Sequence, residues 1–310
     1  MPYIRVRGVD HYYEWIRSAS SSEANPPMVF IHGWGGSSRY WESTAKALGN
    51  CFDCLLYDMR GFGRSTKQGS QRSLGNSPTE SVEQTESQLI PDSSLTAAEL
   101  TYELETYAED LAALLDALHL NRVYINAHSM GASVATFFLN LYPERVEKGI
   151  LTCSGIFEYD EKAFSAFHKF GGYVVKFRPH WLHKIPLADK FFMARFLHRP
   201  LPSAISRAFL KDFLQADYEA ALGTVFTSVS KKASEVMPQE FAKIRVPTLL
   251  VSGQYDKIIP AEMGRRAAQL SDRVEYVVIP GTAHFPMLED PETYLQKVLE
   301  FLGVNCQALA

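Results

Sequence analysis

The chain has 310 residues and a mass of 34.9 kDa, enough for two average domains or for one large α/β domain with an insertion. Hydrophobic residues make up 46% of it and charged residues 21%, proportions that exclude a chain disordered throughout. Its formal charge of -4 argues against sequence-independent binding of nucleic acid, which needs a basic surface.

The apolar runs and the cysteines both favour a cytoplasmic protein. No run approaches the roughly 18 consecutive apolar residues of a membrane-spanning helix, and the first residues lack the apolar core of a signal peptide. Cys51 and Cys54 lack the second pair or histidine cluster of a zinc site. On one strand they would lie roughly 10 Å apart and face opposite ways, too far for a disulfide. We therefore predict that these two cysteines, Cys153 and Cys306 are all reduced.

Strands and helices alternate along most of the chain. Residues 3–8 and 11–17 predict a hairpin that turns at Gly8, Val9 and Asp10. Short, wholly apolar runs, typical of strands covered on both faces, then follow at residues 28–32, 54–57, 123–126, 148–153, 248–252 and 274–279. Amphipathic stretches such as residues 103–118 lie between several of them. This order predicts a mostly parallel, doubly covered α/β sheet.

Two segments interrupt the alternation. Residues 66–96 are rich in Ser, Gln, Glu and Gly, so burial cannot offset the entropy of ordering them, and we predict a mobile surface loop. Residues 157–240 are helical in pattern and dense in aromatic side chains, which predicts a small helical cap on the sheet. The α/β core would then consist of residues 1–156 and 241–310.

The predicted cap has an uneven charge. From Lys162 to Lys211 it contains ten basic residues and a single acid, Asp189. One interpretation is a surface that rests on an anionic membrane or admits an amphiphilic ester. The other is a solvated helix face, with rings that pack the cap's own helices.

The strongest chemical signal lies at residues 123–131, where an apolar strand runs into Ala127-His128-Ser129-Met130-Gly131 and then into a helix. This pattern predicts a nucleophile elbow, a turn so tight that the residues two before and two after the serine must be small. The turn would expose the Ser129 hydroxyl and aim a helix N-terminus at a reacting carbonyl group.

A serine hydroxyl needs a base, and two candidates for its partners follow in the chain. Asp256 comes after the predicted strand at residues 248–252, and His284 comes after the strand at residues 274–279. Both therefore lie beyond the carboxyl ends of parallel strands, where open α/β sheets place their sites. As alternatives, Asp256 is a turn residue and another carboxylate serves, or His284 is a structural loop histidine.

With these segments in place, the chain resembles the α/β-hydrolase fold superfamily, in particular its serine esterase and lipase-like branch with a helical lid between the sixth and seventh strands. The resemblance covers nearly the whole chain, except the polar insertion and the detail of the lid. It rests on residues 32–36 (HGWGG), residues 58–65 (DMRGFGRS), the elbow, and the segments around Asp256 and His284.

The resemblance implies roles for individual residues. Ser129 would be the nucleophile, His284 the general base and then acid, and Asp256 the group that orients the imidazole. The backbone N–H groups of Trp34 and Met130 would form the oxyanion hole. No metal or organic cofactor is implied. The residues expected to line the substrate site are Gly33, His128, Phe157 and Phe285.

Other residues of the motifs have structural interpretations. His32 precedes the serine, and in the family this position ties loops together. Asp58, Arg60 and Arg64 are expected to brace the loop beside the site rather than contact substrate. His128 either lines the pocket or only packs within the elbow.

The nucleophile narrows the reaction. Haloalkane dehalogenases and epoxide hydrolases of this fold use an aspartate at the elbow, so Ser129 argues against both. We expect cleavage of a hydrophobic or amphiphilic carboxylic ester, by a lipase-like enzyme or one resembling the dephytylating esterases. A thioesterase or acyltransferase, a haloperoxidase-like or carbon–carbon bond hydrolase, and a ligand-binding module without turnover remain open, as does the oligomeric state.

Overall fold

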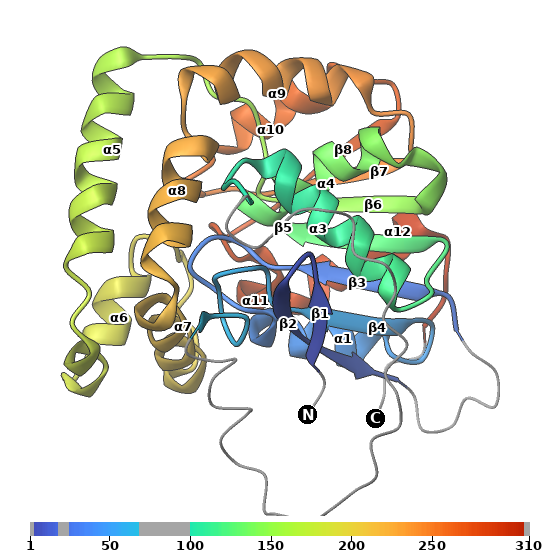
Figure 1. Ribbon diagram of the computed structural model, residues 1–310. Helices are drawn as coiled ribbons and strands as arrows, with labels where there is room; N and C mark the ends of the chain where they lie inside the picture. The colour runs from blue at the N-terminus through green and yellow to red at the C-terminus, as the bar shows by residue number, and fades with distance from the viewer. Residues whose placement is uncertain (1–2, 18–24, 68–99, 307–310) are drawn as a thin grey trace, which may run out of the picture.

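The computed structural model describes residues 3–17, 25–67 and 100–306 (Figure 1). Within them, eight strands form one sheet in the order β1-β2-β4-β3-β5-β6-β7-β8. The strands are β1 (Tyr3–Val6), β2 (Val9–Ile16), β3 (Pro27–Ile31), β4 (Asp53–Tyr57), β5 (Val123–His128), β6 (Val146–Thr152), β7 (Thr248–Gly253) and β8 (Val274–Ile279). From β4 to β8 every neighbouring pair is parallel, which confirms the predicted sheet.

The N-terminal hairpin forms with an earlier turn than predicted. Val6 pairs with Val9, so the turn consists of Arg7 and Gly8, with φ of 48° and 76°. Two consecutive residues with positive φ are the feature of the hairpin turns that match strand twist. Gly8 adopts this conformation at little cost, whereas Val9 and Asp10 already belong to β2.

Helices cover both faces of the sheet. They are α1 (Glu42–Leu48), α3 (Leu104–Ala117), α4 (Met130–Leu141), α5 (Glu161–Lys176), α6 (Ala188–Met193), α7 (Ser203–Gln215), α8 (Tyr218–Ser228), α9 (Lys231–Lys243), α10 (Ala261–Ala268), α11 (Pro286–Glu289) and α12 (Pro291–Leu302), with the 3-10 turns η1 (Ser38–Trp41), η3 (Pro143–Arg145) and η4 (His180–Lys184). Side chains alternate between the two faces: in β3, Val29 and Ile31 pack with α3 and α4, while Met28 and Phe30 pack with α1 and α12.

The chain between β6 and β7 is helical and holds α5 to α9 (Figure 1). In Figure 1, α5 stands at the outer left edge with α8 beside it. Helix α7 is joined to the turn after β3 by Asp212, which bonds Ser37, the residue before η1, and Arg39 within η1. Burial raises the pKa of Asp212 to about 6 although Arg39 and Ser37 oppose the shift.

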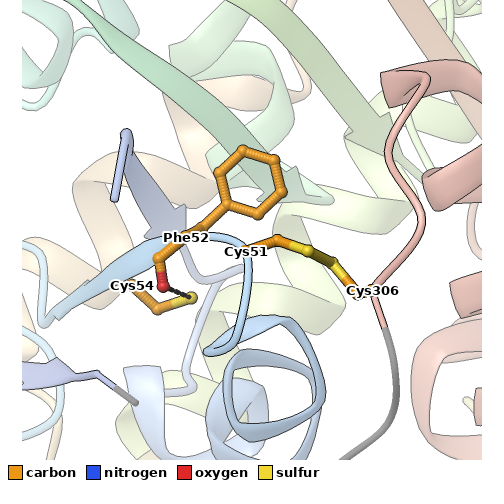
Figure 2. Close-up of a disulfide and its surroundings, with 4 residues drawn as sticks. All are labelled: Cys51, Phe52, Cys54 and Cys306. Atoms are coloured by element: carbon orange, nitrogen blue, oxygen red, sulfur yellow. Dashed lines mark hydrogen bonds between the residues drawn. A yellow bond between two sulfur atoms is a disulfide. The ribbon is translucent and has the colours of Figure 1, made fainter. Parts of the chain in front are cut away.

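One prediction about the cysteines is wrong. Cys51 and Cys306 form a disulfide between the turn before β4 and the segment after α12, with Cα atoms 5.8 Å apart (Figure 2). Cys54 and Cys153 are free and buried. The partners are 255 residues apart in sequence, so the spacing of Cys51 and Cys54 carried no information about the pair. Because disulfides are rare in the cytosol, the argument from reduced cysteines for a cytoplasmic protein is lost, and that localisation stays a prediction.

Two further predictions from the sequence concern the polar insertion and membrane-spanning helices. Most of the predicted mobile loop at residues 66–96 lies outside the described residues. Across the described ranges, no helix is both long enough and apolar enough to cross a membrane.

Candidate active site

The turn after β5 has the geometry of a nucleophile elbow. Ser129 adopts φ 54° and ψ -123°, a strained conformation for a residue with a side chain, and α4 begins at the next residue. A Cβ on Gly131 would lie 2.3 Å from the carbonyl oxygen of His32, so only glycine fits there. Ala127 is fully buried. The tight turn therefore explains the small residues on both sides of the serine.

Three side chains from separate loops meet at this turn. Nε2 of His284 lies 3.0 Å from Oγ of Ser129, and Nδ1 of His284 lies 2.7 Å from Oδ2 of Asp256. Asp256 follows β7 and His284 follows β8, so the carboxyl ends of the parallel strands bring them together. Both side chains are almost fully buried.

The carboxylate of Asp256 is held ionised. Its Oδ1 accepts hydrogen bonds from the backbone N–H groups of Ile258 (2.8 Å) and Ile259 (3.0 Å). Burial by itself raises the pKa of Asp256, but the proximity of His284 and these hydrogen bonds outweigh it and lower the pKa below its usual value. Because an ionised carboxylate can only accept, Nδ1 of His284 carries the proton and Nε2 faces the Ser129 hydroxyl as an acceptor.

His32 joins two loops, as the sequence predicts. Its Nε2 accepts from the backbone N–H of Met59 at 2.9 Å, and its Nδ1 donates to the carbonyl of Gly33 at 2.8 Å. Burial lowers the pKa of His32, so the ring is neutral in this tautomer. The residue is structural, since both ring nitrogens are occupied by backbone groups.

Asp58 and Arg64 brace the loop beside the site. Asp58 accepts hydrogen bonds from the backbone and hydroxyl of Ser38 (2.8 and 2.6 Å) and from the backbone and Nε of Arg64 (2.8 Å each). Burial raises the pKa of Asp58, yet Arg64 and the other donors lower it to about 2. Arg60 ties the same loop to α3, because its Nε donates to Asp110 of that helix at 2.9 Å. All three side chains thus brace this loop, as predicted.

A hydrogen-bonded chain through Tyr40 was not predicted. The backbone N–H of Gly33 donates to the Tyr40 hydroxyl, which lies 3.0 Å from Nδ1 of His128. Nε2 of His128 donates to the carbonyl of His284 at 2.7 Å. Burial and the nearby His284 hold the pKa of His128 well below its usual value, so the ring is neutral. Tyr40 and His128 thereby connect the loop after β3, the elbow and the His284 loop.

The predicted substrate contacts occupy different places. His128 is buried with both nitrogens bonded to protein groups, and Phe285 is buried with its ring 4.7 Å from that of His128 and 5.0 Å from that of Phe209. Their placement argues against substrate contact, because the packing encloses both side chains. Gly33 abuts the elbow, since a Cβ there would lie 3.1 Å from Cβ of Ser129. Phe157 is half-buried between β6 and α5, and its contact with substrate stays a prediction.

The two backbone N–H groups proposed for the oxyanion hole belong to Met130, directly after Ser129, and to Trp34 in the loop after β3. Met130 is the first residue of α4, so the helix has no partner for its N–H. Trp34 follows Gly33, and its indole Nε1 donates to the carbonyl of Ala221 in α8 at 2.9 Å. The side chain of Trp34 thus fastens the loop after β3 to the helices between β6 and β7, in addition to its expected backbone role.

Aromatic rings, one of them buried and three half-buried, extend from the triad towards α6 and α7. The ring of Phe196 lies 6.1 Å from that of His284 and 5.9 Å from that of Phe192. Phe213 lies 4.9 Å from Phe192 and 5.4 Å from Trp34. We call these four residues, Trp34, Phe192, Phe196 and Phe213, the aromatic wall. The aromatic density of residues 157–240 predicts a cap but does not indicate which rings reach the site.

One group of side chains has the spacing of a metal site. Ligand atoms of His128, Cys153 and His284 lie within 4.8 Å of one another. However, each ring nitrogen of the two histidines already has a hydrogen-bond partner in the protein. An ion would therefore have to break the contacts that hold Ser129, His284 and Asp256 together.

Comparison with known proteins identifies the family. The sequence model of the alpha/beta hydrolase fold matches residues 26–291. This chain belongs to the α/β-hydrolase family. A Synechocystis sp. protein provisionally named a non-heme chloroperoxidase is 27% identical over 92% of this hydrolase and 93% of its own length. The proline iminopeptidase of Heyndrickxia coagulans is 22% identical over 89% and 90%.

Solved structures have the same fold. The enol-lactonase of Burkholderia xenovorans LB400 matches 98% of this hydrolase and 100% of its own chain, with a TM-score of 0.72 and 20% identity. Membership of the family supports hydrolase activity, but the relatives are named for different reactions. The bond that this α/β hydrolase cleaves therefore depends on its own site.

Proposed function

We propose that this α/β hydrolase is a serine hydrolase that cleaves hydrophobic carboxylic esters through an acyl-enzyme intermediate. The observation that carries the proposal is the pair of hydrogen bonds from Ser129 to His284 (3.0 Å) and from His284 to Asp256 (2.7 Å). A serine hydroxyl is a weak nucleophile until a neighbouring base accepts its proton. Nε2 of His284 is that base, because Asp256 holds the proton of the ring on Nδ1.

In the first half of the reaction, Oγ of Ser129 bonds to the carbonyl carbon of the ester while its proton moves to Nε2 of His284. The negative charge on the former carbonyl oxygen is stabilised by the backbone N–H groups of Met130 and Trp34. The tetrahedral species collapses, the bond to the alcohol oxygen breaks, and His284 donates its proton to that oxygen. Asp256 stabilises the imidazolium ion between the two proton transfers.

In the second half, water attacks the acyl group on Ser129. His284 accepts a proton from the water, the same backbone groups stabilise the oxyanion, and the proton then returns to Oγ of Ser129 as the acid leaves. The atoms balance with ester and water as the only reactants.

The aromatic wall supports an apolar substrate. Its four rings extend from the triad to α6 and α7, and none of them carries a charge that could face the acyl or alcohol part of an ester. Burial of an apolar chain against such rings contributes on the order of 25 cal/mol per Å². Short, polar esters would gain little from this wall.

Covalent labelling tests the nucleophile. A fluorophosphonate probe should label the wild-type enzyme, and Ser129→Ala should abolish the labelling. Ser133→Ala is a matched control, because Ser133 lies one turn further along α4 and has no role in the proposed mechanism. Labelling that survives in Ser129→Ala, or a wild type that resists the probe, would contradict the proposal.

Hydrolysis of esters with graded acyl chains tests the substrate class. We expect kcat/KM to rise from acetate to longer acyl chains, and activity that peaks on acetate would contradict the apolar substrate. Adding an alcohol or an amine to the assay separates hydrolysis from acyl transfer, because a transferase would form the new ester or amide in place of the acid.

A further inference from the structure

Helix α5 exposes a row of aromatic side chains. Phe167, Phe170, Tyr173 and Phe177 recur every three or four residues, so they share one side of the helix and of its C-terminal end. Their exposed fractions are 42%, 66%, 62% and 77%. Large apolar side chains that a helix turns towards solvent lack the packing that normally stabilises them.

The opposite side of α5 already has a partner in the protein. Phe164 and Val175 are buried, and a Cβ on Gly171 would lie only 3.1 Å from Val225 of α8. The ring of His168 lies 4.8 Å from that of Phe226, also in α8. Helix α5 lies at the edge of the molecule with α8 beside it (Figure 1). Because α8 occupies one side of α5, the aromatic row on the opposite side faces away from α8.

The exposed apolar side chains continue beyond α5. Trp181, Ile185, Leu187 and Phe191, in η4 and α6 and the turn between them, are 56%, 42%, 52% and 78% exposed. We call these four residues and the four on α5 the outer apolar surface. Scattered exposed apolar residues are normal, but a concentration of large ones in one stretch of chain marks an interaction site.

Basic side chains accompany the outer apolar surface. They include Lys169, Lys176, Lys184, Lys190 and Arg195, none of which has a carboxylate of the described residues within 4 Å. Asp189, the only acid from Lys162 to Lys211, is buried. Lys169 and Lys176 are seven residues apart and so lie on the same side of α5. The surface is therefore apolar and cationic, although the whole chain carries a charge of -4.

We propose that the outer apolar surface docks on an anionic lipid bilayer, with α5 lying in the plane of the interface. Tryptophan, tyrosine and phenylalanine side chains insert at the boundary between headgroups and acyl chains, and lysines attract anionic lipids. An amphipathic segment with both features binds by apolar burial and by charge together.

A second copy of the chain is the competing occupant. In a symmetric dimer the same patch meets itself, so the unpaired lysines and Arg195 of one copy would face those of the other. No exposed acid within residues 162–211 is present to neutralise them. Charge complementarity therefore favours the bilayer.

Helix α6 connects this surface to the candidate site. Phe191 is 78% exposed, whereas its neighbour Phe192 belongs to the aromatic wall and packs 5.9 Å from Phe196. The ring of Phe196 in turn lies 6.1 Å from that of His284. If the proposed function holds, a docked enzyme would place its aromatic wall next to esters dissolved in the bilayer, which identifies membrane-borne esters as the substrate class.

Vesicle co-sedimentation tests the docking. The protein is the full chain with Ser129→Ala, so that binding is measured without turnover. The vesicles contain either phosphatidylcholine alone or phosphatidylcholine mixed with phosphatidylglycerol. We expect binding to the anionic vesicles that weakens as salt is added, and much weaker binding to the neutral ones.

Variants locate the surface. Phe170→Ser with Phe177→Ser should weaken binding about tenfold or more, since two aromatic insertions are lost. Lys176→Glu should weaken it at least about fivefold, since one attractive charge near the membrane becomes repulsive. The matched controls are Leu141→Ser with Leu270→Ser, which replace exposed apolar residues elsewhere, and Arg245→Glu, which reverses an exposed charge elsewhere. These controls should bind as the parent does.

Three outcomes would overturn the docking proposal: equal binding of the neutral and anionic vesicles at all salt concentrations, surface variants that bind like the parent, or a concentration-dependent dimer that only the phenylalanine variants abolish. In the active background, all variants should keep their thermal midpoint and their activity on a soluble short ester. Ester turnover and vesicle binding are separate readouts. Loss of the first with retention of the second would reject the proposed function and leave the docking intact.

Discussion

The loops around Ser129 and the helices α5 and α6 both contain many aromatic and charged side chains, but the two regions place them differently. Around Ser129, buried polar groups such as Asp58, Tyr40 and His128 have defined hydrogen-bond partners within the protein. On α5 and α6, aromatic side chains such as Phe170 and Phe191 are exposed and lack packing.

This difference separates the residues that hold the geometry of the candidate site from those that we propose bind the protein to a membrane. Removing one partner of a buried polar pair lowers the stability of the protein, because the remaining buried group is left without a hydrogen bond. Exposed aromatic side chains contribute little to the stability of the fold, so their concentration in one stretch of chain indicates an interaction site. Substitutions in the first region should alter the rate, the stability or both, whereas those in the second should alter only binding to a surface.

The largest expected effect follows from Asp256→Asn. The amide can donate as well as accept, so it no longer fixes the proton of His284 on Nδ1 or stabilises the imidazolium ion. We expect kcat/KM for a soluble ester to fall by about 10⁴-fold with little change in thermal midpoint. Asp272→Asn, at an exposed carboxylate, is the control. A fall of less than tenfold would mean that another carboxylate orients the ring.

The sequence predicts those parts of the molecule whose cause is local. Apolar runs locate the core strands, and the small residues Ala127 and Gly131 indicate the elbow, because each signal lies within a few consecutive residues. Each triad residue, Ser129, Asp256 or His284, follows an apolar run that forms a strand. The carboxyl ends of these parallel strands meet at one edge of the sheet, which brings the three side chains together.

Features that join distant parts of the chain were not predictable in this way. The disulfide links residues 255 apart, and the bonds of His128 reach Tyr40 and the carbonyl of His284, 88 and 156 residues away. No local pattern marks Tyr40, which lies in the turn η1 outside every motif. Likewise, aromatic density in the segment between β6 and β7 did not show which rings face the site and which face solvent.

Truncating one buried and one exposed phenylalanine tests whether exposed aromatic side chains contribute to folding. Phe138 on α4 is fully buried and Phe170 on α5 is 66% exposed. Phe138→Ala should lower the free energy of unfolding by about 3–5 kcal/mol, because it leaves a cavity in the core. Phe170→Ala should change it by no more than about 0.5 kcal/mol. Urea denaturation measures both, and a large loss in Phe170→Ala would show that the aromatic row is structural.

The acid stability of the protein tests the bracing by Asp58. Its pKa is about 2 in the folded state and 3.8 ordinarily, so the folded state holds the proton less tightly. The resulting stabilisation, about 2 kcal/mol, is present above pH 4 and is lost as the pH falls towards 2. Asp58→Asn should be less stable at neutral pH and should show a correspondingly smaller loss between pH 4 and pH 2 in urea titrations. An unchanged acid profile in this variant would mean that Asp58 is not held ionised by Arg64 and Ser38.

The smallest effect is expected from Tyr40→Phe, which removes one hydroxyl and with it the link from Gly33 to His128. Tyr107→Phe is its match, since it also removes a buried hydroxyl, one that bonds the carbonyl of Arg60 at 3.1 Å away from the triad. Each should cost about 1 kcal/mol of stability, because one buried hydrogen bond is lost. Only Tyr40→Phe should also lower kcat, by about fivefold, because the elbow and the His284 loop then lose a shared support. If both variants lower kcat equally, or neither does, the chain through Tyr40 serves folding alone and does not position Ser129 against its base.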